Sequence, residues 1–196
     1  MKSAYVSTFK RPLDILVCLV LFVLTSWLLI LISLVYLFTF QFPVLFKQER
    51  IGLNNQTFVM YKFRTLASDG AASVQQRRFW LGDFLRFFSL DELPQLWNVW
   101  VGEMSLIGPR PLPLEYLSKM NDEQKQRHLL RPGITGLTQV SGRHALAWEK
   151  KFDLDRYYVH HVSLVMDLKI LLKTIVLLVS MKKDQSLEEK KFEGNP

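Results

Sequence analysis

Two adjacent acids near the middle of the chain are the first candidates for chemistry. The stretch FFSLDELPQLWNV places Asp91 and Glu92 just before Pro94. Proline is tolerated in the first turn of a helix, where backbone N–H groups have no intrahelical partner, so we expect a helix to begin near Asp91. The acids could be structural, with Ser89 and Glu92 forming a capping box or Asp91 acting as the cap. Alternatively, one carboxylate is a nucleophile or a metal ligand.

Cations in nearby stretches favour the chemical interpretation. Arg110 lies between two prolines in IGPRPLP, and proline restricts both its own backbone and that of the residue before it. An immobilised guanidinium suits a bidentate grip on phosphate. The stretch RPGITGLTQVSGR ends in Arg143 and adds glycines and hydroxyls that could approach an anion. Because Mg²⁺ binds through one or two carboxylates plus substrate phosphates, the set predicts phosphoryl chemistry.

The composition limits the classes of partner. The chain has 196 residues, a formal net charge of +7 and 49% hydrophobic residues. This size suits one domain with attachments, and the charge favours anionic partners: nucleic acid, a phospholipid surface or a phosphorylated substrate. The single cysteine, Cys18, permits no intrachain disulfide and suggests a reducing compartment. The four histidines show no zinc-type spacing, so we interpret them as surface or packing residues.

The first 46 residues contain a membrane segment. No residue from Ile15 to Phe40 is charged, and about 20 apolar residues suffice to cross a bilayer. Lysine and arginine collect on cytoplasmic flanks, yet here they lie on both sides of the segment. A re-entrant hairpin, which leaves the membrane on the side where it entered, would resolve this conflict; a single-pass anchor is the alternative. Thr25 and Ser26 could bend the helix through hydroxyl bonds to backbone carbonyls.

The rest of the chain predicts a small, mostly helical α+β domain over residues 47–181. Two β-rich stretches flank Asn54-Asn55, which predicts a β-hairpin with Lys62 on its second strand. The aromatic and basic stretch 77–88 predicts an amphipathic helix at the lipid interface, with core packing as the competing interpretation. A second amphipathic helix is expected over 162–181. The charged tail, residues 182–196, is predicted to be disordered.

Five stretches together resemble the bacterial sugar transferase family of monotopic phosphoglycosyl transferases. In chain order they are KRPLDILVCLVLFVLTS, YKFRTL, LRFFSLDELPQLWNVWVGEMSLIGPRPL, RPGITGLTQVSGR and WEKKFDLDRYYVHH. The length most resembles the small members that initiate bacterial N-linked protein glycosylation. The resemblance implies transfer of a phosphosugar from a UDP-sugar to undecaprenyl phosphate, with release of UMP. It further implies Mg²⁺ dependence, a place on the cytoplasmic face of the bacterial inner membrane, and downstream glycosyltransferases as possible partners.

The same resemblance assigns roles to individual residues. It implies that Asp91 is the nucleophile and a magnesium ligand, and that Glu92 is its catalytic partner. It also implies a substrate-binding set consisting of Lys62, Arg86, Arg110, Arg143 and Asp155. One departure concerns the re-entrant helix: members of the family usually carry Ser-Pro at the bend, whereas this chain has Ser26-Trp27. Without the proline, another feature must bend the helix.

Two other classes of function compete with this interpretation. A membrane-anchored binding module that recruits an acidic partner would explain the apolar segment and the net charge, but it has no use for two acids among arginines. Nucleic-acid binding ranks lower, because the basic residues are interleaved with aromatic residues typical of a lipid interface.

Overall fold

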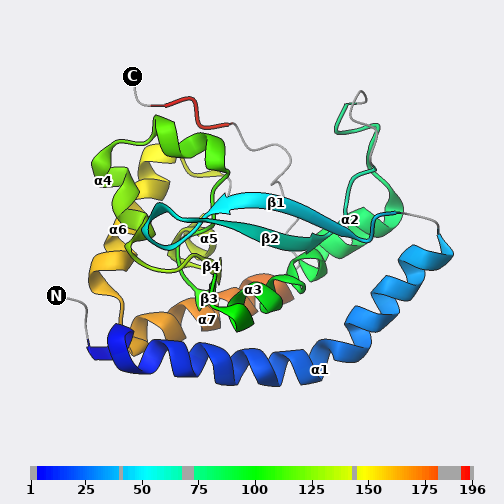
Figure 1. The fold of residues 1–196 in the computed structure, drawn as a ribbon, viewed down its shortest axis with the longest axis horizontal. Helices are drawn as coiled ribbons and strands as arrows, with labels where there is room; N and C mark the ends of the chain where they lie inside the picture. Colours follow the sequence, from blue (N-terminus) through cyan, green and yellow to red (C-terminus); the bar gives the residue numbers. More distant parts are fainter. Residues whose placement is uncertain (1–3, 40–41, 68–72, 143–144, 181–190, 195–196) are drawn as a thin grey trace.

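The N-terminal segment forms one continuous helix that curves. The computed structural model describes residues 4–39, 42–67, 73–142, 145–180 and 191–194. A short π-helix, η1 (Tyr5–Phe9), leads into α1 (Lys10–Phe38). Figure 1 shows α1 running along the lower edge of the molecule and rising in its C-terminal part. By length and composition, residues Tyr5–Phe38 could cross a membrane.

Helix α1 has no break between Lys10 and Phe38, so the predicted re-entrant hairpin is not confirmed and stays a prediction. The hydroxyls of Thr25 and Ser26 nevertheless act as expected. They donate to the carbonyls of Leu21 (2.7 Å) and Val23 (2.9 Å). Such bonds to the preceding turn often bend a helix without breaking it, which accounts for the curvature.

The predicted β-hairpin is confirmed. Strand β1 (Leu45–Ile51) pairs antiparallel with β2 (Thr57–Phe63). The short 3₁₀ turn η2 (Leu53–Asn55) joins them. Asn54 and Asn55 have φ values of 53° and 63°, the left-handed conformation that asparagine tolerates better than most residues. The turn pair is therefore placed as the sequence predicts.

Three short elements follow the hairpin and carry the acidic pair. Helix α2 (Trp80–Phe87) lies within the predicted range 77–88. The 3₁₀ turn η3 (Leu90–Glu92) comes next, and then α3 (Gln95–Val101). Leu81 and Leu85 of α2 are buried, whereas Trp80 is 67% exposed. The helix is therefore amphipathic, with one aromatic side left uncovered.

A second, parallel pair of short strands connects the two loops that the sequence marks for anion binding. Strand β3 (Ser105–Ile107) pairs with β4 (Gly133–Thr135). Between them lie three short elements: η4 (Leu114–Lys119), α4 (Asp122–Lys125) and η5 (Gln126–Leu129). Helix α5 (Leu137–Ser141) follows β4. The loop 108–113 thus starts at the end of β3, beside the end of β4.

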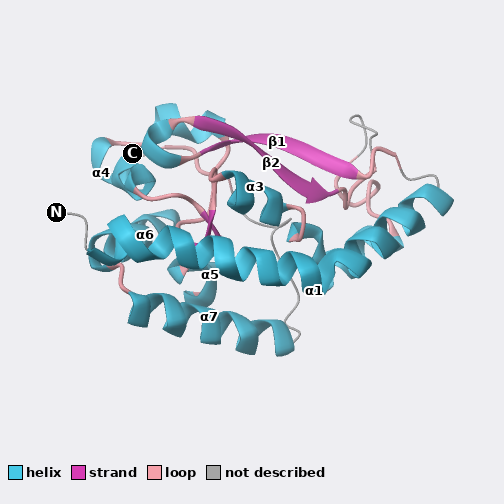
Figure 2. Cartoon of the chain, turned by 60° about the horizontal axis from the view of Figure 1, so that its bottom comes forward, coloured by secondary structure: helices cyan, strands magenta, loops and turns pink. Residues whose placement is uncertain are grey.

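Helices α6 (Trp148–His161) and α7 (Leu164–Val179) complete the described helices. Figure 2 shows α1 and α7 on the same face of the molecule. Residues 181–190 of the predicted tail lie outside the described residues. Phe192 is described and is 3% exposed, packed against Tyr116, Trp148 and Phe152. The prediction of disorder is therefore wrong for Phe192, because this side chain fills an aromatic cluster.

Both halves of α1 pack on the rest of the protein. Cys18 in the first half belongs to a buried cluster with Met60 of β2 and Val99 of α3. Tyr36 in the second half belongs to a cluster with Phe63 and Leu85. The apolar side chains of α1 that face away from these clusters stay exposed. The helix is therefore attached along its length rather than projecting freely.

A buried ion pair fixes the start of α1. Lys10 Nζ lies 2.6 Å from Asp167 Oδ2 of α7. The same carboxylate accepts bonds from the hydroxyls of Tyr5 (2.8 Å) and Tyr158 (2.7 Å). Both members of the pair are buried, and a buried charge that loses its partner is strongly destabilising. Asp167 therefore joins α7 to the N-terminal helix.

Candidate active site

The acidic pair lies on a turn and caps no helix. Ser89 adopts a left-handed conformation (φ 56°) and its side chain makes no capping hydrogen bond. Helix α3 starts at Gln95 with Pro94 as its N-cap residue, so Asp91 is not its cap either. Both structural alternatives for the acids are therefore wrong. A residue other than glycine rarely adopts positive φ, so the conformation of Ser89 costs backbone energy at this turn.

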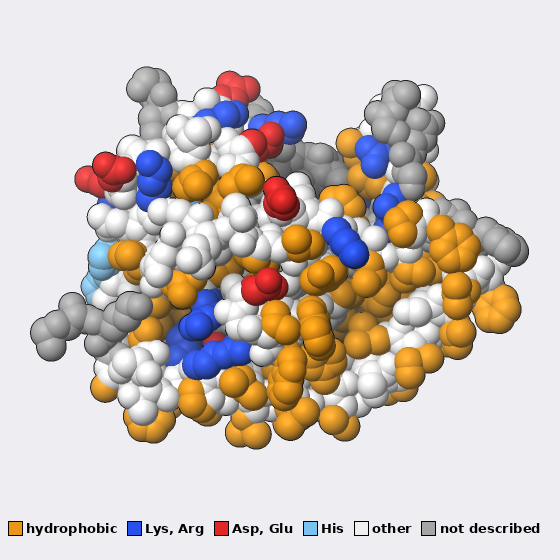
Figure 3. Space-filling view, viewed as in Figure 1, with side chains coloured by type: hydrophobic (Ala, Val, Ile, Leu, Met, Phe, Trp, Pro, Cys, Tyr) orange, Lys and Arg blue, Asp and Glu red, His pale blue; other side chains and the backbone are white. Residues whose placement is uncertain are grey.

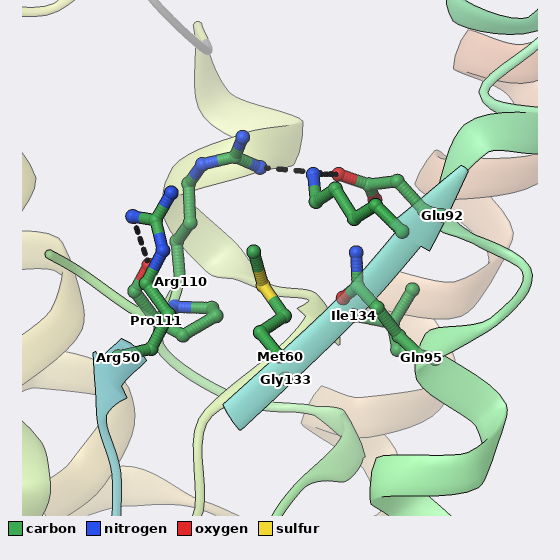
Figure 4. A pocket seen from close by; sticks show the side chains of 9 residues that line it. Arg50, Met60, Glu92, Gln95, Arg110, Pro111, Gly133 and Ile134 are labelled. Atoms are coloured by element: carbon green, nitrogen blue, oxygen red, sulfur yellow. Dashed lines mark hydrogen bonds and ion pairs between the residues drawn. The ribbon is translucent and has the colours of Figure 1, made fainter. Parts of the chain in front are cut away.

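Glu92 is bound by cations from two separate parts of the chain. Lys62 Nζ, from β2, lies 2.6 Å from Glu92 Oε1. Arg110 Nη1, from the loop after β3, lies 3.7 Å from the same oxygen. Figure 4 shows Arg110 and Glu92 directed toward each other at one end of a pocket. The structure thus brings together three of the predicted site residues, while Asp91, the neighbour of Glu92, is buried at 8% exposure.

The pocket is lined by residues from six segments: β1, β2, η3, α3, the loop 108–113 and β4. Its lining residues are Arg50, Met60, Lys62, Glu92, Gln95, Arg110, Pro111, Gly133 and Ile134. Arg50 comes from β1, Gln95 from α3, and the last two residues from β4. The site therefore requires the hairpin, the α3 segment and the parallel strand pair to be assembled together.

The glycines of the two loops serve chain packing. A Cβ on Gly133 would lie 2.1 Å from the backbone nitrogen of Gly108, and a Cβ on Gly136 would lie 2.0 Å from the Gly108 carbonyl oxygen. The Gly108 N–H donates to the Thr135 carbonyl and the Gly133 N–H to the Pro109 carbonyl. These two amides are satisfied by the protein. Gly133 and Gly136 therefore allow the Arg110 loop to lie close to β4, and the predicted approach of glycine amides to an anion stays a prediction.

Asp155 lies on α6 and does not line the pocket. Its carboxylate is 2% exposed, paired with Arg127 at 2.5 Å, and accepts a bond from the Thr138 hydroxyl at 2.6 Å. Arg127 Nη2 also donates to the backbone carbonyl of Arg110 (2.8 Å). In this arrangement Asp155 acts on the site through Arg127, which holds the backbone of Arg110.

The remaining predicted substrate-binding residues have other positions. Arg86 lies on α2 and donates to the Thr65 side chain and backbone carbonyl, which ties α2 to the chain that leaves β2. It does not line the pocket. Arg143 lies outside the described residues. Its predicted role in substrate binding stays a prediction.

Sequence reasoning missed two residues of the pocket, Arg50 and Gln95. Burial, and then the nearby Arg110 guanidinium, lower the pKa of Arg50 to about 10. The charged form of Arg50 is therefore destabilised, and ionisable groups with such shifted pKa values are common at binding sites. Arg50 is one of several basic residues that follow the membrane segment, and Gln95 carries no charge. The spacing of Gln95 four residues after Asp91 was the one available signal.

An exposed apolar surface lies directly beside the acidic pair. Phe87 and Phe88 precede it and Trp97 follows it, and all three are 38–52% exposed. Figure 3 shows hydrophobic side chains crowding the surface of α1 in the same view as Figure 1. We refer to the exposed apolar residues of α1, α2, α3 and α7 as the apolar face. The pocket lined by Glu92 and this apolar face therefore meet close to the same turn.

Comparison with known proteins agrees with this geometry. A family model described as "Bacterial sugar transferase" matches residues 5–181. The chain belongs to the bacterial sugar transferase family. The resemblance seen in the sequence is thereby confirmed, over nearly the whole chain.

Individual relatives place the chain within the bacterial sugar transferase family. It is 42% identical over 171 residues to the uncharacterized sugar transferase EpsL of Bacillus subtilis, covering 85% of each chain. It is 38% identical over 156 residues to a UDP-glucose:undecaprenyl-phosphate glucose-1-phosphate transferase of Xanthomonas campestris, covering 71% of this chain and 32% of that protein. It is 34% identical over 188 residues to an undecaprenyl-phosphate galactose phosphotransferase of Salmonella typhimurium, covering 84% and 39%. The matched region is therefore a small part of the latter two proteins.

Proposed function

We propose that this protein transfers a phosphosugar from a UDP-sugar to undecaprenyl phosphate and releases UMP. The observation that carries the proposal is the turn at Asp91-Glu92, whose second carboxylate is held by two cations in a pocket bordering the apolar face. A phosphorylated, water-soluble donor and a phosphorylated lipid acceptor must meet where a charged pocket adjoins an apolar surface. The names of the Xanthomonas and Salmonella relatives describe sugar phosphate transfer to the same kind of acceptor.

In the first step, a carboxylate oxygen of Asp91 attacks the β-phosphorus of the UDP-sugar. A new O–P bond forms, and the bond between this phosphorus and the bridging oxygen breaks. UMP leaves with the electron pair, and the sugar phosphate stays on Asp91. Covalent catalysis of this kind divides one difficult displacement into two easier ones.

In the second step, a phosphate oxygen of undecaprenyl phosphate attacks the same phosphorus. The bond from phosphorus to Asp91 breaks, the carboxylate is restored, and undecaprenyl-diphospho-sugar is released. Lys62 and Arg110 offset the negative charge that gathers on the phosphoryl oxygens in both steps. Glu92 keeps these two cations in place.

The acidic pair has the donor chemistry for a magnesium ion. Asp91 and Glu92 are the residues that would hold Mg²⁺, and the ion would neutralise charge on the diphosphate. Within the described part of the chain, no three His, Cys, Asp or Glu side chains gather in one group. Mg²⁺ usually takes one or two protein carboxylates and completes its shell with substrate phosphates and water.

We further propose that α1 enters and leaves the membrane on the cytoplasmic side, making the protein monotopic. Lys10 joins the start of α1 to α7, and Tyr36 near its end packs on Phe63 and donates to the Arg64 carbonyl. Both ends of the helix are thus held by the same globular part. A helix that crossed the bilayer would carry one end away from that part.

The function is tested by UMP release from purified protein supplied with Mg²⁺, undecaprenyl phosphate and a panel of UDP-sugars. We expect turnover with at least one sugar, and a loss of roughly a thousandfold or more in Asp91→Asn, because an amide oxygen is a poor nucleophile. Asp153→Asn removes an exposed carboxylate on α6 and is the matched control, with wild-type turnover expected. Near-normal UMP release by Asp91→Asn, with the variant folded and in the membrane, would contradict the assignment.

A further inference from the structure

The pocket contains a guanidinium to which the proposed reaction gives no role. Arg50 Nη1 donates to the Pro111 carbonyl (3.2 Å), and Nη2 donates to Gln48 Oε1 (2.6 Å). Both acceptors are neutral. Among the described residues, the buried Nε of Arg50 has no hydrogen-bond partner. Glu92 and Glu115 favour the charged form of Arg50, but less than burial and Arg110 disfavour it.

A second donor in the same pocket is also unsatisfied. Gln95 is 2% exposed, and its Nε2 has no hydrogen-bond partner within the described part of the chain. Figure 4 shows the Gln95 side chain directed into the pocket, below Glu92. A buried amide N–H without an acceptor costs free energy that folding must offset elsewhere. Such a group points to a ligand that supplies the acceptor.

The charges of the pocket define the chemistry of that ligand. Three lining residues are cationic (Arg50, Lys62 and Arg110), and Glu92 is the one carboxylate among the lining residues of this pocket. At one end of the pocket Arg50 lies close enough to Arg110 that the Arg110 guanidinium disfavours the charge of Arg50. Donors with an excess of positive charge match a multiply charged oxyanion.

The position of Arg50 is fixed by the loop that also carries Arg110. The Ile51 N–H donates to the Leu112 carbonyl (3.0 Å), and Arg50 pairs with Pro113 across an isolated antiparallel bridge. The end of β1 is therefore attached to the loop 108–113. Arg50 and Arg110, which are far apart in the sequence, are thereby held near each other. This arrangement is required if both guanidinium groups are to bind one anion.

We propose that Arg50 and Gln95 form the deep end of the diphosphate-binding site, with Arg50 and Arg110 gripping the anion from two sides and Gln95 donating to one of its oxygens. This inference rests on the proposed function and adds two residues to it. Arg50 and Gln95 would bind the diphosphate equally well in the ground state and in the transition state. We therefore expect their loss to raise KM for the UDP-sugar more than it lowers kcat.

Calorimetric titration of the full-length protein in lipid nanodiscs with Mg²⁺ tests the inference. The probes are inorganic pyrophosphate and UDP, and the variants are Arg50→Gln, Arg50→Lys and Gln95→Leu. Arg156→Gln, on an exposed part of α6, makes the same charge change as Arg50→Gln and is the matched control. Thermal unfolding verifies that each variant is folded. Arg50→Lys and Gln95→Leu keep the test valid if Arg50→Gln unfolds.

We expect roughly tenfold or greater weakening of both probes in Arg50→Gln and Gln95→Leu, partial recovery in Arg50→Lys, and no change in the control. Wild-type affinity in folded Arg50→Lys and Gln95→Leu, while the wild-type protein turns over, would overturn the inference and leave the proposed function intact. Loss of pyrophosphate binding in the variants of a protein that turns over no UDP-sugar would support the anion site and overturn the function. A wild-type protein that binds neither probe and releases no UMP would overturn both.

Discussion

At the scale of single residues, the site is built from side chains that hold one another. Glu92 is bound by Lys62 and Arg110, and the Arg110 backbone is bound by Arg127, which pairs with Asp155. Each member of this chain of contacts is fixed by the next. A substitution at Asp155 should therefore act on catalysis through the position of Arg110 rather than through the substrate.

His128 gives the fold a dependence on pH. It is buried, its Nδ1 lies 2.6 Å from Asn55 Oδ1 in the hairpin turn, and burial, followed by the nearby Arg127, lowers its pKa to about 3. The unfolded chain takes up this proton near pH 6.5, whereas the folded protein does not. The stabilisation is thus fully present above pH 6.5 and is lost as pH falls toward 3. We expect the free energy of unfolding to drop by about 2 kcal/mol between pH 7 and 5 from this residue.

Urea unfolding in detergent at pH 7 and pH 5, followed by tryptophan fluorescence, measures this loss. His128→Asn retains a donor toward Asn55 and removes the titrating group, so it should lose less stability on acidification than the wild-type protein. His160→Asn, an exposed histidine on α6, should behave as wild type. Equal losses in the wild-type protein and His128→Asn would show that His128 is not the source.

The sequence predicts the charged members of the site better than its neutral or distant ones. Glu92, Lys62 and Arg110 were predicted from residue type and family resemblance, and the structure brings them together. Gln95 carries no charge to suggest a role, and Arg50 is 60 residues from Arg110 in the chain. Their place in the pocket depends on how β1 packs on the loop 108–113, which no local pattern contains.

At the scale of elements, α1 is the feature that sequence describes least completely. Its length and apolar character are plain from the residues, and the bonds of Thr25 and Ser26 were expected. Helix α1 has no break at Ser26-Trp27, because Trp27 keeps the backbone N–H that a proline at this position would lack. The attachment of its two ends, through Lys10 and Tyr36, depends on partners more than 25 residues away.

Cysteine labelling tests whether α1 returns to the side it entered. Ser7→Cys in η1 and Ser118→Cys in η4 are both exposed, and each is introduced in a Cys18→Ala background. A membrane-impermeant maleimide should label neither in intact cells and both after permeabilisation. Labelling of Ser7→Cys from outside, with Ser118→Cys protected, would mean that α1 crosses the membrane.

At the scale of the whole molecule, the exposed apolar side chains are concentrated on one face. The apolar face comprises α1, α2, α3 and the outer side of α7, whose Leu172 and Val176 are 64% and 66% exposed. Exposed patches of this extent mark interaction surfaces, and here the patch adjoins the acidic turn. The aromatic cluster around Trp148 lies with the start of α6, at the other side of the fold from α1 in Figure 1.

Quenching by brominated lipids tests this orientation. The chain has five tryptophans, and variants that keep one of them, with phenylalanine at the other four, report on single positions. Trp97 is 52% exposed on the apolar face, so its emission should be strongly quenched. Trp148, packed against Tyr116 and Phe152, is the matched control and should keep its emission. Equal quenching of the two would contradict the proposed membrane face.

The account depends most directly on a covalent bond between Asp91 and phosphorus. The decisive measurement is intact-protein mass spectrometry after incubation with Mg²⁺ and a UDP-sugar that the enzyme turns over, without undecaprenyl phosphate. We predict an increase by the mass of one sugar phosphate, located on the peptide containing Asp91, matched by release of UMP and discharged by added acceptor. Absence of this adduct on rapid quenching, under conditions in which turnover proceeds once acceptor is supplied, would contradict the nucleophilic role of Asp91.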